Sequence, residues 1–176
     1  AKQIWSDLFK ESFSLGDQRF NEAVFIYEAH VESCVFSLHA MADILAQIIN
    51  VIVLKDQFKE GFVVIERVIQ EMRKKHIALE VADKAENLLR DNTFQYIGAF
   101  CNTIKHRRLL QSNFQAEYGE KARNESGLKF EAFQYKGYSF HQEWGSDIIG
   151  QYRSHLLSLI TEIGLHINRY VSTMPL

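Results

Sequence analysis

The residues best able to carry chemistry in this chain form one short run, residues 101–108, which reads CNTIKHRR. Asn102 and His106 are four residues apart, so on a helix they lie one turn apart on the same side. An imidazole titrates near neutral pH and can transfer protons, while a nearby amide can orient the imidazole or a phosphate. Three cations flank the histidine and could neutralise phosphate charge; they are Lys105, Arg107 and Arg108. The run therefore predicts a contact with RNA or a nucleotide.

The same run also has a purely structural interpretation, as the solvated end of a helix. Cationic side chains in a last turn stabilise the negative end of the helix dipole, so basic helix ends are common. On a helix, Ile97, Phe100 and Ile104 would form the apolar face. Asn102 and His106 would lie roughly opposite, on a polar side that also carries Ala99. That opposite side is either open solvent surface or a groove against a second molecule, and the sequence leaves both interpretations open.

The arrangement resembles the HEPN superfamily of nucleotide-binding domains, which are compact helical bundles, usually dimeric. Many members are ribonucleases of phage-defence or toxin–antitoxin systems. The family motif is an Arg, commonly followed by a small polar residue such as Asn, and then a His a few positions further along the third helix. Asn102 and His106 match the polar residue and the His, and Cys101 stands where the family has Arg. The resemblance implies an RNA- or nucleotide-binding or regulatory domain that forms a homodimer.

The resemblance also implies how an enzyme of this kind would act. In the family, Arg and His from two protomers meet and cleave RNA without metal, through attack of the 2′-hydroxyl on the adjacent phosphate. The Arg offsets charge on the phosphate and the His transfers protons. A Cys offers neither a fixed charge nor a guanidinium fork. With Cys101 in that place, the sequence favours binding over cleavage; the enzymatic alternative is a cofactor-free endoribonuclease that uses His106 and Asn102.

A second enzymatic hypothesis uses three other histidines. Helical bundles can hold metal ions through carboxylate and imidazole ligands one turn apart, the spacing of Glu162 and His166. Metal binding through His39 with His155 or His166 would make the chain a metal-dependent helical-bundle enzyme. The Glu-x-x-His motif that dinuclear sites use is missing from the sequence, which favours a solvated charged face instead. A third hypothesis is a structural domain that binds another protein.

Amphipathic helices must position these residues. Helical spacing of apolar residues predicts long helices over 24–52, 61–75, 79–110 and 149–174, and a short helix over 4–13. The first of these carries a continuous heptad seam, formed by Val24, Tyr27, Val31, Cys34, Leu38, Met41, Leu45, Ile48 and Ile52. A helix of this length needs long partners, so we expect an all-α fold, an antiparallel four-helix-type bundle in a single domain, residues 1–176.

Residues 113–142 differ from the rest of the chain. They contain three glycines and alternate between apolar and polar residues, which is typical of strands, and Lys136-Gly137 predicts a hairpin turn. We therefore expect a β-hairpin or three-stranded insertion before the last helix. Its aromatic residues could stack on bases, but packing of the sheet against the bundle is the favoured interpretation. These residues are Phe130, Phe133, Tyr135, Tyr138, Phe140 and Trp144.

Composition limits the partners and the compartment. The 20 basic and 22 acidic residues give a formal net charge of -2, so any contact with nucleic acid must be local. Cys34 and Cys101 fall in apolar helical patterns, which suits reduced core thiols better than a disulfide. No uninterrupted apolar run is long enough to span a bilayer, so we expect a cytoplasmic protein that does not bind membranes.

Overall fold

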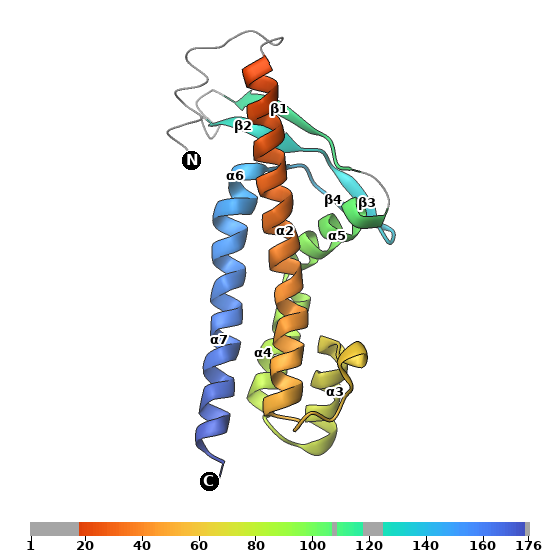
Figure 1. The fold of residues 1–176 in the computed structure, drawn as a ribbon, viewed down its shortest axis with the longest axis vertical. Coiled ribbons are helices and arrows are strands. Elements are labelled where there is room, and N and C mark those ends of the chain that lie inside the picture. The colour runs from red at the N-terminus through yellow and green to blue at the C-terminus, as the bar shows by residue number, and fades with distance from the viewer. Residues whose placement is uncertain (1–17, 107–108, 118–124, 175–176) are drawn as a thin grey trace.

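The computed structural model describes residues 18–106, 109–117 and 125–174. The fold is elongated and mostly helical (Figure 1). Helices α2 (Gln18–Ile52) and α7 (Arg153–Ser172) run side by side in the same direction, and a small sheet lies near their N-terminal ends. The helix predicted over 4–13 lies outside the described residues. A mostly helical chain with a small antiparallel sheet before its last helix is thus confirmed.

Helix α2 confirms the long first helix, but its buried face differs from the predicted heptad seam. Ile48 and Ile52 are 40% and 41% exposed, whereas Val35, Ala42 and Ile49 are buried. Val31, Leu38 and Leu45 of the predicted seam are buried, so the first heptad row is confirmed over these positions. The second row was wrong, because positions three and four after a first-row residue both lie next to it on the helix, and packing buries the fourth in place of the third. Cys34 and Met41 of the predicted second row are partly buried and pack against the core.

The helix predicted over 79–110 is in fact two helices, α4 (Leu79–Arg90) and α5 (Asn92–His106). Between them, Asp91 has an extended backbone, with φ −66° and ψ 129°. Its Oδ1 accepts a hydrogen bond from the backbone N–H of Phe94 at 3.0 Å. This is an N-cap, in which a side chain satisfies an otherwise unpaired N–H in the first turn of a new helix. Asp91 therefore ends one helix and starts the next.

The insertion forms both of the structures that the sequence left open, a three-stranded sheet and a hairpin. The three-stranded sheet is antiparallel, in the order β1 (Ser112–Glu117), β2 (Glu125–Phe130) and β5 (Glu143–Trp144). The hairpin pairs β3 (Phe133–Tyr135) with β4 (Tyr138–Phe140). Its turn residues, Lys136 and Gly137, have φ of 49° and 84°, and positive φ at both central positions is typical of a type I′ turn.

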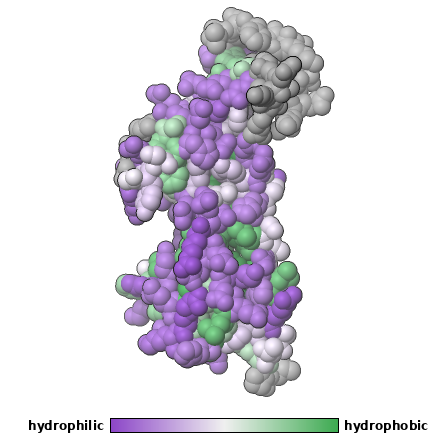
Figure 2. Space-filling model, turned by 180° about the vertical axis from the view of Figure 1, so that it is seen from behind, coloured by the Kyte–Doolittle hydropathy of each residue, from purple (hydrophilic) through white to green (hydrophobic). Residues whose placement is uncertain are grey.

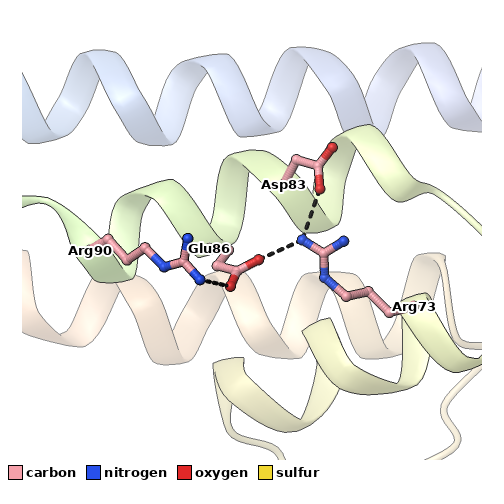
Figure 3. Close-up of polar contacts among 4 residues, drawn as sticks. All are labelled: Arg73, Asp83, Glu86 and Arg90. Atoms are coloured by element: carbon pink, nitrogen blue, oxygen red, sulfur yellow. Dashed lines mark hydrogen bonds and ion pairs between the residues drawn. The ribbon is translucent and has the colours of Figure 1, made fainter.

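Shorter segments complete the fold. They are the 3-10 helix η1 (Glu60–Phe62), helix α3 (Ile65–Lys75), the single turn α6 (Gly145–Asp147) and the π-helix η2 (Ile148–Tyr152), which leads directly into α7. Arg73 joins α3 to α4: its guanidinium lies 2.8 Å from Asp83 and 2.5 Å from Glu86, which also pairs with Arg90 (Figure 3). These pairs are largely exposed, so their role is mainly to orient the two helices.

Helices α4 and α7 run antiparallel and are joined by three polar pairs. These pairs are Asp91 with His155 at 2.8 Å, Lys84 with Glu162 at 2.6 Å, and Glu80 with His166 at 3.0 Å. From the first pair to the second, the position on the α4 side moves back by seven residues and the position on α7 moves forward by seven. From the second pair to the third, both positions move by four residues. The spacing corresponds to full helical turns on both helices, so the pairs fix the register of this contact.

The described surface is polar with scattered apolar residues. Seen from behind, it is mostly hydrophilic, and the apolar patches are separate (Figure 2). By length and composition alone, α2 is the one described helix that could cross a membrane, and the core helix of a soluble protein meets the same test. Along α2, Val31, Val35 and Ile49 are buried in the core of the fold.

Among the described glycines, Gly145 has the closest neighbouring side chain, where the sheet leads into the last helical segment. A Cβ added to Gly145 would lie 2.6 Å from Cε1 and 2.9 Å from the hydroxyl oxygen of Tyr27. Only glycine fits against the tyrosine ring at this distance. The contact joins the N-terminal half of α2 to the start of α6.

We expect Gly145→Ala to lower the free energy of unfolding by about 1–3 kcal/mol, because the tyrosine ring must move. Gly164, inside α7, has open space around the position of a Cβ. Gly164→Ala is the matched control and should raise stability by about 0.5–1 kcal/mol, because alanine favours the helix. Urea unfolding of both variants measures the difference, and equal effects would contradict the close contact.

Candidate functional site

Asn102 and His106 lie in the last two turns of α5, as the sequence predicted. The imidazole of His106 is exposed and has no hydrogen bond or ion pair with any residue that the structure describes. Asn102 is half-buried, and its Nδ2 donates to the carbonyl oxygen of Gly98 at 2.7 Å. In the described part of the chain, nothing joins the amide to the imidazole. Asn102 is thus held by its own helix, while His106 is available to a second molecule.

The structure describes the position of Lys105, one of the three cations that the sequence predicted to bind phosphate. The Lys105 side chain is exposed, and its Nζ lies 5.2 Å from the ring centroid of Phe36 on α2, which is cation–π distance. Arg107 and Arg108, the other predicted phosphate-binding residues, lie outside the described residues. Of the predicted cations, Lys105 is therefore the one with a described position, at the contact between α2 and α5.

Cys101, in the place of the family's Arg, is completely buried. Burial raises the pKa of its thiol, against the opposing effect of the nearby Lys105 ammonium, so the thiol is protonated at neutral pH and packs as a small apolar group. Both Cys101 and the half-buried Cys34 are free thiols. Positions 101 and 106 are about 140° apart around the helix axis. A longer side chain at 101 would therefore start inside the core and away from His106.

The buried surface of α5 is broader than the sequence predicted. Ala99, which was placed on the polar side, is only 4% exposed, and Tyr96 and Thr103 are also buried. The prediction was wrong for Ala99 because it assumed one partner on one side of the helix. In the structure, α5 contacts α2 on one side, and its aromatic residues contact the β3–β4 hairpin on another.

His39 of α2 packs beside Gly98 of α5. A Cβ added to Gly98 would meet Cδ2 of His39 at 3.6 Å, an ordinary contact distance, so the two helices approach closely here. Burial lowers the pKa of His39, as does the charge of Lys105, while Asp43 has the opposite effect. His39 is therefore a neutral, half-buried imidazole of the helix contact at physiological pH.

The three histidines of the metal hypothesis lie at different contacts. His39 is at the contact of α2 with α5, His155 pairs with Asp91, and His166 pairs with Glu80. Glu162, one turn before His166, pairs with Lys84 instead of sharing a ligand site. Within residues 18–106, 109–117 and 125–174, no group of three or more His, Cys, Asp or Glu side chains could hold a metal ion.

A polar cluster that the sequence did not single out surrounds Glu143. Its Oε2 accepts a hydrogen bond from the hydroxyl of Tyr152 and lies 3.0 Å from Nε2 of His141. The hydroxyl of Tyr96 is buried without a hydrogen-bond partner in the described structure. Burial and the Glu143 carboxylate raise the pKa of both tyrosines, so both phenols stay protonated.

This cluster joins the end of the sheet to the start of the last helix. Tyr152 is the last residue of η2, and the wider turn of a π-helix alters the direction of side chains there. A sequence signal existed, since Tyr152 fits the apolar spacing of the last helix and Glu143 follows the aromatic strand residues. Nothing in the sequence, however, indicated that these side chains would meet.

Comparison of the chain with family models, curated proteins and solved structures finds no match. The HEPN resemblance depends on the short motif at Asn102 and His106 and on the helical architecture.

We expect Cys101→Arg to lower the free energy of unfolding by about 3 kcal/mol or more, because it places an unpaired cation in a buried site near Lys105. Cys101→Ala, which only removes the sulfur, should cost about 1 kcal/mol. Chemical denaturation measures both. An arginine variant as stable as the wild type would show that the helix contact opens readily toward solvent.

The lowered pKa of His39 predicts a pH dependence of stability. Because folding favours the neutral imidazole, the unfolded chain binds more protons at pH values between the folded pKa and the ordinary value of 6.5. The contribution of His39 to the free energy of unfolding should be fully present above pH 6.5 and should be lost as the pH drops toward the pKa of the folded state. Thermal unfolding midpoints at a series of pH values would measure this.

The His39→Gln variant is the control for this measurement, because it has no imidazole to titrate. Its midpoint should change less between neutral and mildly acidic pH than the wild-type midpoint does. Glu71 and Glu162 have pKa values lowered from 4.5, so they titrate below this window. Identical pH profiles for variant and wild type would contradict the assigned environment of His39.

Proposed function

We propose that this protein is a HEPN-like RNA-binding domain and that the C-terminal end of α5 contacts the RNA. The observation that carries the proposal is His106, an exposed imidazole without a partner among the described residues, at the end of a helix. Lys105 precedes it, and Arg107 and Arg108 follow it in the sequence. An imidazole without a partner in the described structure, next to several cations in the sequence, suits a phosphate-bearing ligand.

Charge distribution along the chain supports the proposal. Residues 92–116 contain no Asp or Glu, although the whole chain has 22 acidic residues. The same stretch contains Lys105, Arg107 and Arg108, so it is a local cationic segment in a chain of net charge -2. Binding of RNA phosphates by such a segment releases counterions, which makes the affinity depend steeply on salt.

Binding is favoured over cleavage by the environment of position 101. Proton transfer could be supplied by His106, but stabilisation of the developing phosphate charge requires a fixed cation close to it. Cys101 is buried and uncharged, and Lys105 lies over Phe36. A cation from a second protomer would be needed, so we propose a homodimer as the assembly in which any ribonuclease activity would occur.

We further propose the broader assignment that goes with the resemblance. The helices would form a four-helix-type bundle of the HEPN kind, in a cytoplasmic protein of a defence or toxin–antitoxin system. The direct supporting observations are the mostly helical fold and the position of the motif at the end of α5. A regulatory protein partner is compatible with the same surface.

We expect His106→Ala to weaken the binding of single-stranded RNA by the metal-free protein, because it removes a hydrogen-bonding group from the contact. The wild-type affinity should fall linearly with salt on a logarithmic plot, with a slope of about −0.7 for each phosphate neutralised. Fluorescence anisotropy with a labelled RNA measures both effects, and a gel of the same RNA detects cleavage.

The control is His30→Ala, which removes another exposed histidine on α2. This variant should bind RNA as the wild type does. If His30→Ala and His106→Ala weaken binding equally, or if wild-type protein binds no RNA at low salt, the proposed contact at α5 is wrong. Metal-independent cleavage that disappears in His106→Ala would instead assign the protein as a ribonuclease.

A further inference from the structure

The β3–β4 hairpin has one face made entirely of aromatic side chains. Phe133 lies opposite Phe140, and Tyr135 lies opposite Tyr138. Residues directly opposite each other in an antiparallel pair lie on the same face, as do residues two apart in one strand. All four rings therefore share one face, while Gln134 and Ser139 share the other.

The inner half of this aromatic face is buried against α5. Phe133 is 4% exposed, and its ring is stacked with that of Phe140 at 5.1 Å. Tyr96 and Phe100 of α5 contact Phe133 with ring centroids 5.6 Å and 5.9 Å away. This half confirms that the insertion packs against the helices through its aromatic residues.

The outer half of the same face extends into solvent. Tyr138 is 73% exposed, the highest value among the large apolar side chains that are described as exposed. It directly follows the turn at Lys136 and Gly137, whose positive φ values are those of a tight type I′ connection. A short turn of this kind holds the tyrosine in a defined position at the tip of the hairpin. Folding leaves this ring uncovered, although it belongs to a face that is otherwise packed.

The charge of the hairpin suits an anionic partner. Residues 132–142 contain no Asp or Glu, and their exposed side chains beyond the tyrosine include Gln134, Lys136, Ser139, His141 and Gln142. Among them, Lys136 is a cation and His141 pairs with the carboxylate of Glu143, which follows the hairpin. The Nζ of Lys136 lies 5.4 Å from the ring centroid of Tyr135, so a cation accompanies the exposed end of the aromatic face.

The hairpin contacts α5 at Tyr96 and Phe100, and the end of the helix lies beyond this contact. Phe100, which contacts Phe133, is six residues before His106, about 9 Å along the helix axis. After α5 the chain returns to the start of the hairpin, where the backbone N–H of Glu131 donates to the carbonyl oxygen of Gln111 at 3.0 Å. In Figure 1 the end of α5 and the β3–β4 hairpin lie on the same side of the molecule.

We propose that the ring of Tyr138 stacks on a base of single-stranded RNA whose phosphates contact the end of α5. This inference rests on the proposed RNA-binding function and adds a second contact to it. An exposed aromatic ring near a cation, on a hairpin that itself carries no carboxylate, resembles the arrangement that single-strand-binding proteins use, because every base offers a flat face for stacking. The absence of acidic groups in the hairpin favours RNA over a basic protein partner.

The test is anisotropy of a labelled oligouridine and of an abasic RNA of the same length, at one salt concentration. Tyr138→Ala should weaken oligouridine binding by roughly 5- to 100-fold, whereas Tyr138→Phe, which keeps the ring, should stay within about twofold of the wild type. Binding of the abasic RNA should be the same for all variants, since no base is present to stack. Leu165→Ala, at a 53% exposed position on α7, is the control for loss of an exposed apolar side chain.

The outcomes separate this inference from the proposed function. If wild-type protein binds RNA and His106→Ala weakens it, but Tyr138→Ala binds like the wild type, the stacking contact is wrong and the α5 contact stands. If Tyr138→Ala weakens the binding of abasic RNA as much as the binding of oligouridine, the stacking contact is also wrong. A wild type that binds no RNA overturns both, and capture of a protein by wild type but not by Tyr138→Ala would then assign the hairpin to a protein interface.

Discussion

The packing of α5 between α2 and the β3–β4 hairpin is the constraint on which the rest of the structure depends. One side of α5 carries small groups, with Gly98 against His39 and the buried Cys101 near Lys105. Another side carries Tyr96 and Phe100, whose rings fill the contact with the hairpin. With both sides occupied, the exposed side chains of α5 lie in its first turn and at its end, where Lys105 and His106 are found.

Asp91 gives α5 its direction. One carboxylate oxygen caps the first turn of α5 through the N–H of Phe94, and the other pairs with His155 of α7. The same residue thus ends α4, starts α5 and forms the polar pair between α4 and α7 that lies nearest the start of α7. Because α5 starts anew at this point, it does not continue along α7 and is free to pack across α2.

The two exposed groups proposed to contact RNA come from distant parts of the sequence. His106 ends a helix and Tyr138 lies at the tip of a hairpin, and both belong to segments without carboxylates. The acidic residues are concentrated in other segments, where several pair with cations between helices. A chain of slightly negative net charge can in this way keep a local surface that suits an anionic ligand. In the proposed function, the buried, uncharged Cys101 is the reason that binding is favoured over cleavage.

Much of the framework could be predicted from local pattern. The long first helix, the hairpin turn at Lys136 and Gly137, and the position of Asn102 and His106 near a helix end followed from apolar spacing and turn chemistry. The predictions failed where a partner decides the outcome. On α2 the first heptad row was right, but packing buried the second row one residue further along than predicted. Ala99 was misplaced because α5 has partners on more than one side.

By itself, the sequence determined which segments are helices or strands and which residues could carry charge or chemistry, since these depend on neighbours a few positions away. Tertiary structure alone decided that Cys101 is buried, that His39, His155 and His166 lie at separate contacts, and that Tyr138 remains uncovered. Burial and the meeting of distant side chains depend on how elements pack across the chain. No local pattern contains that information.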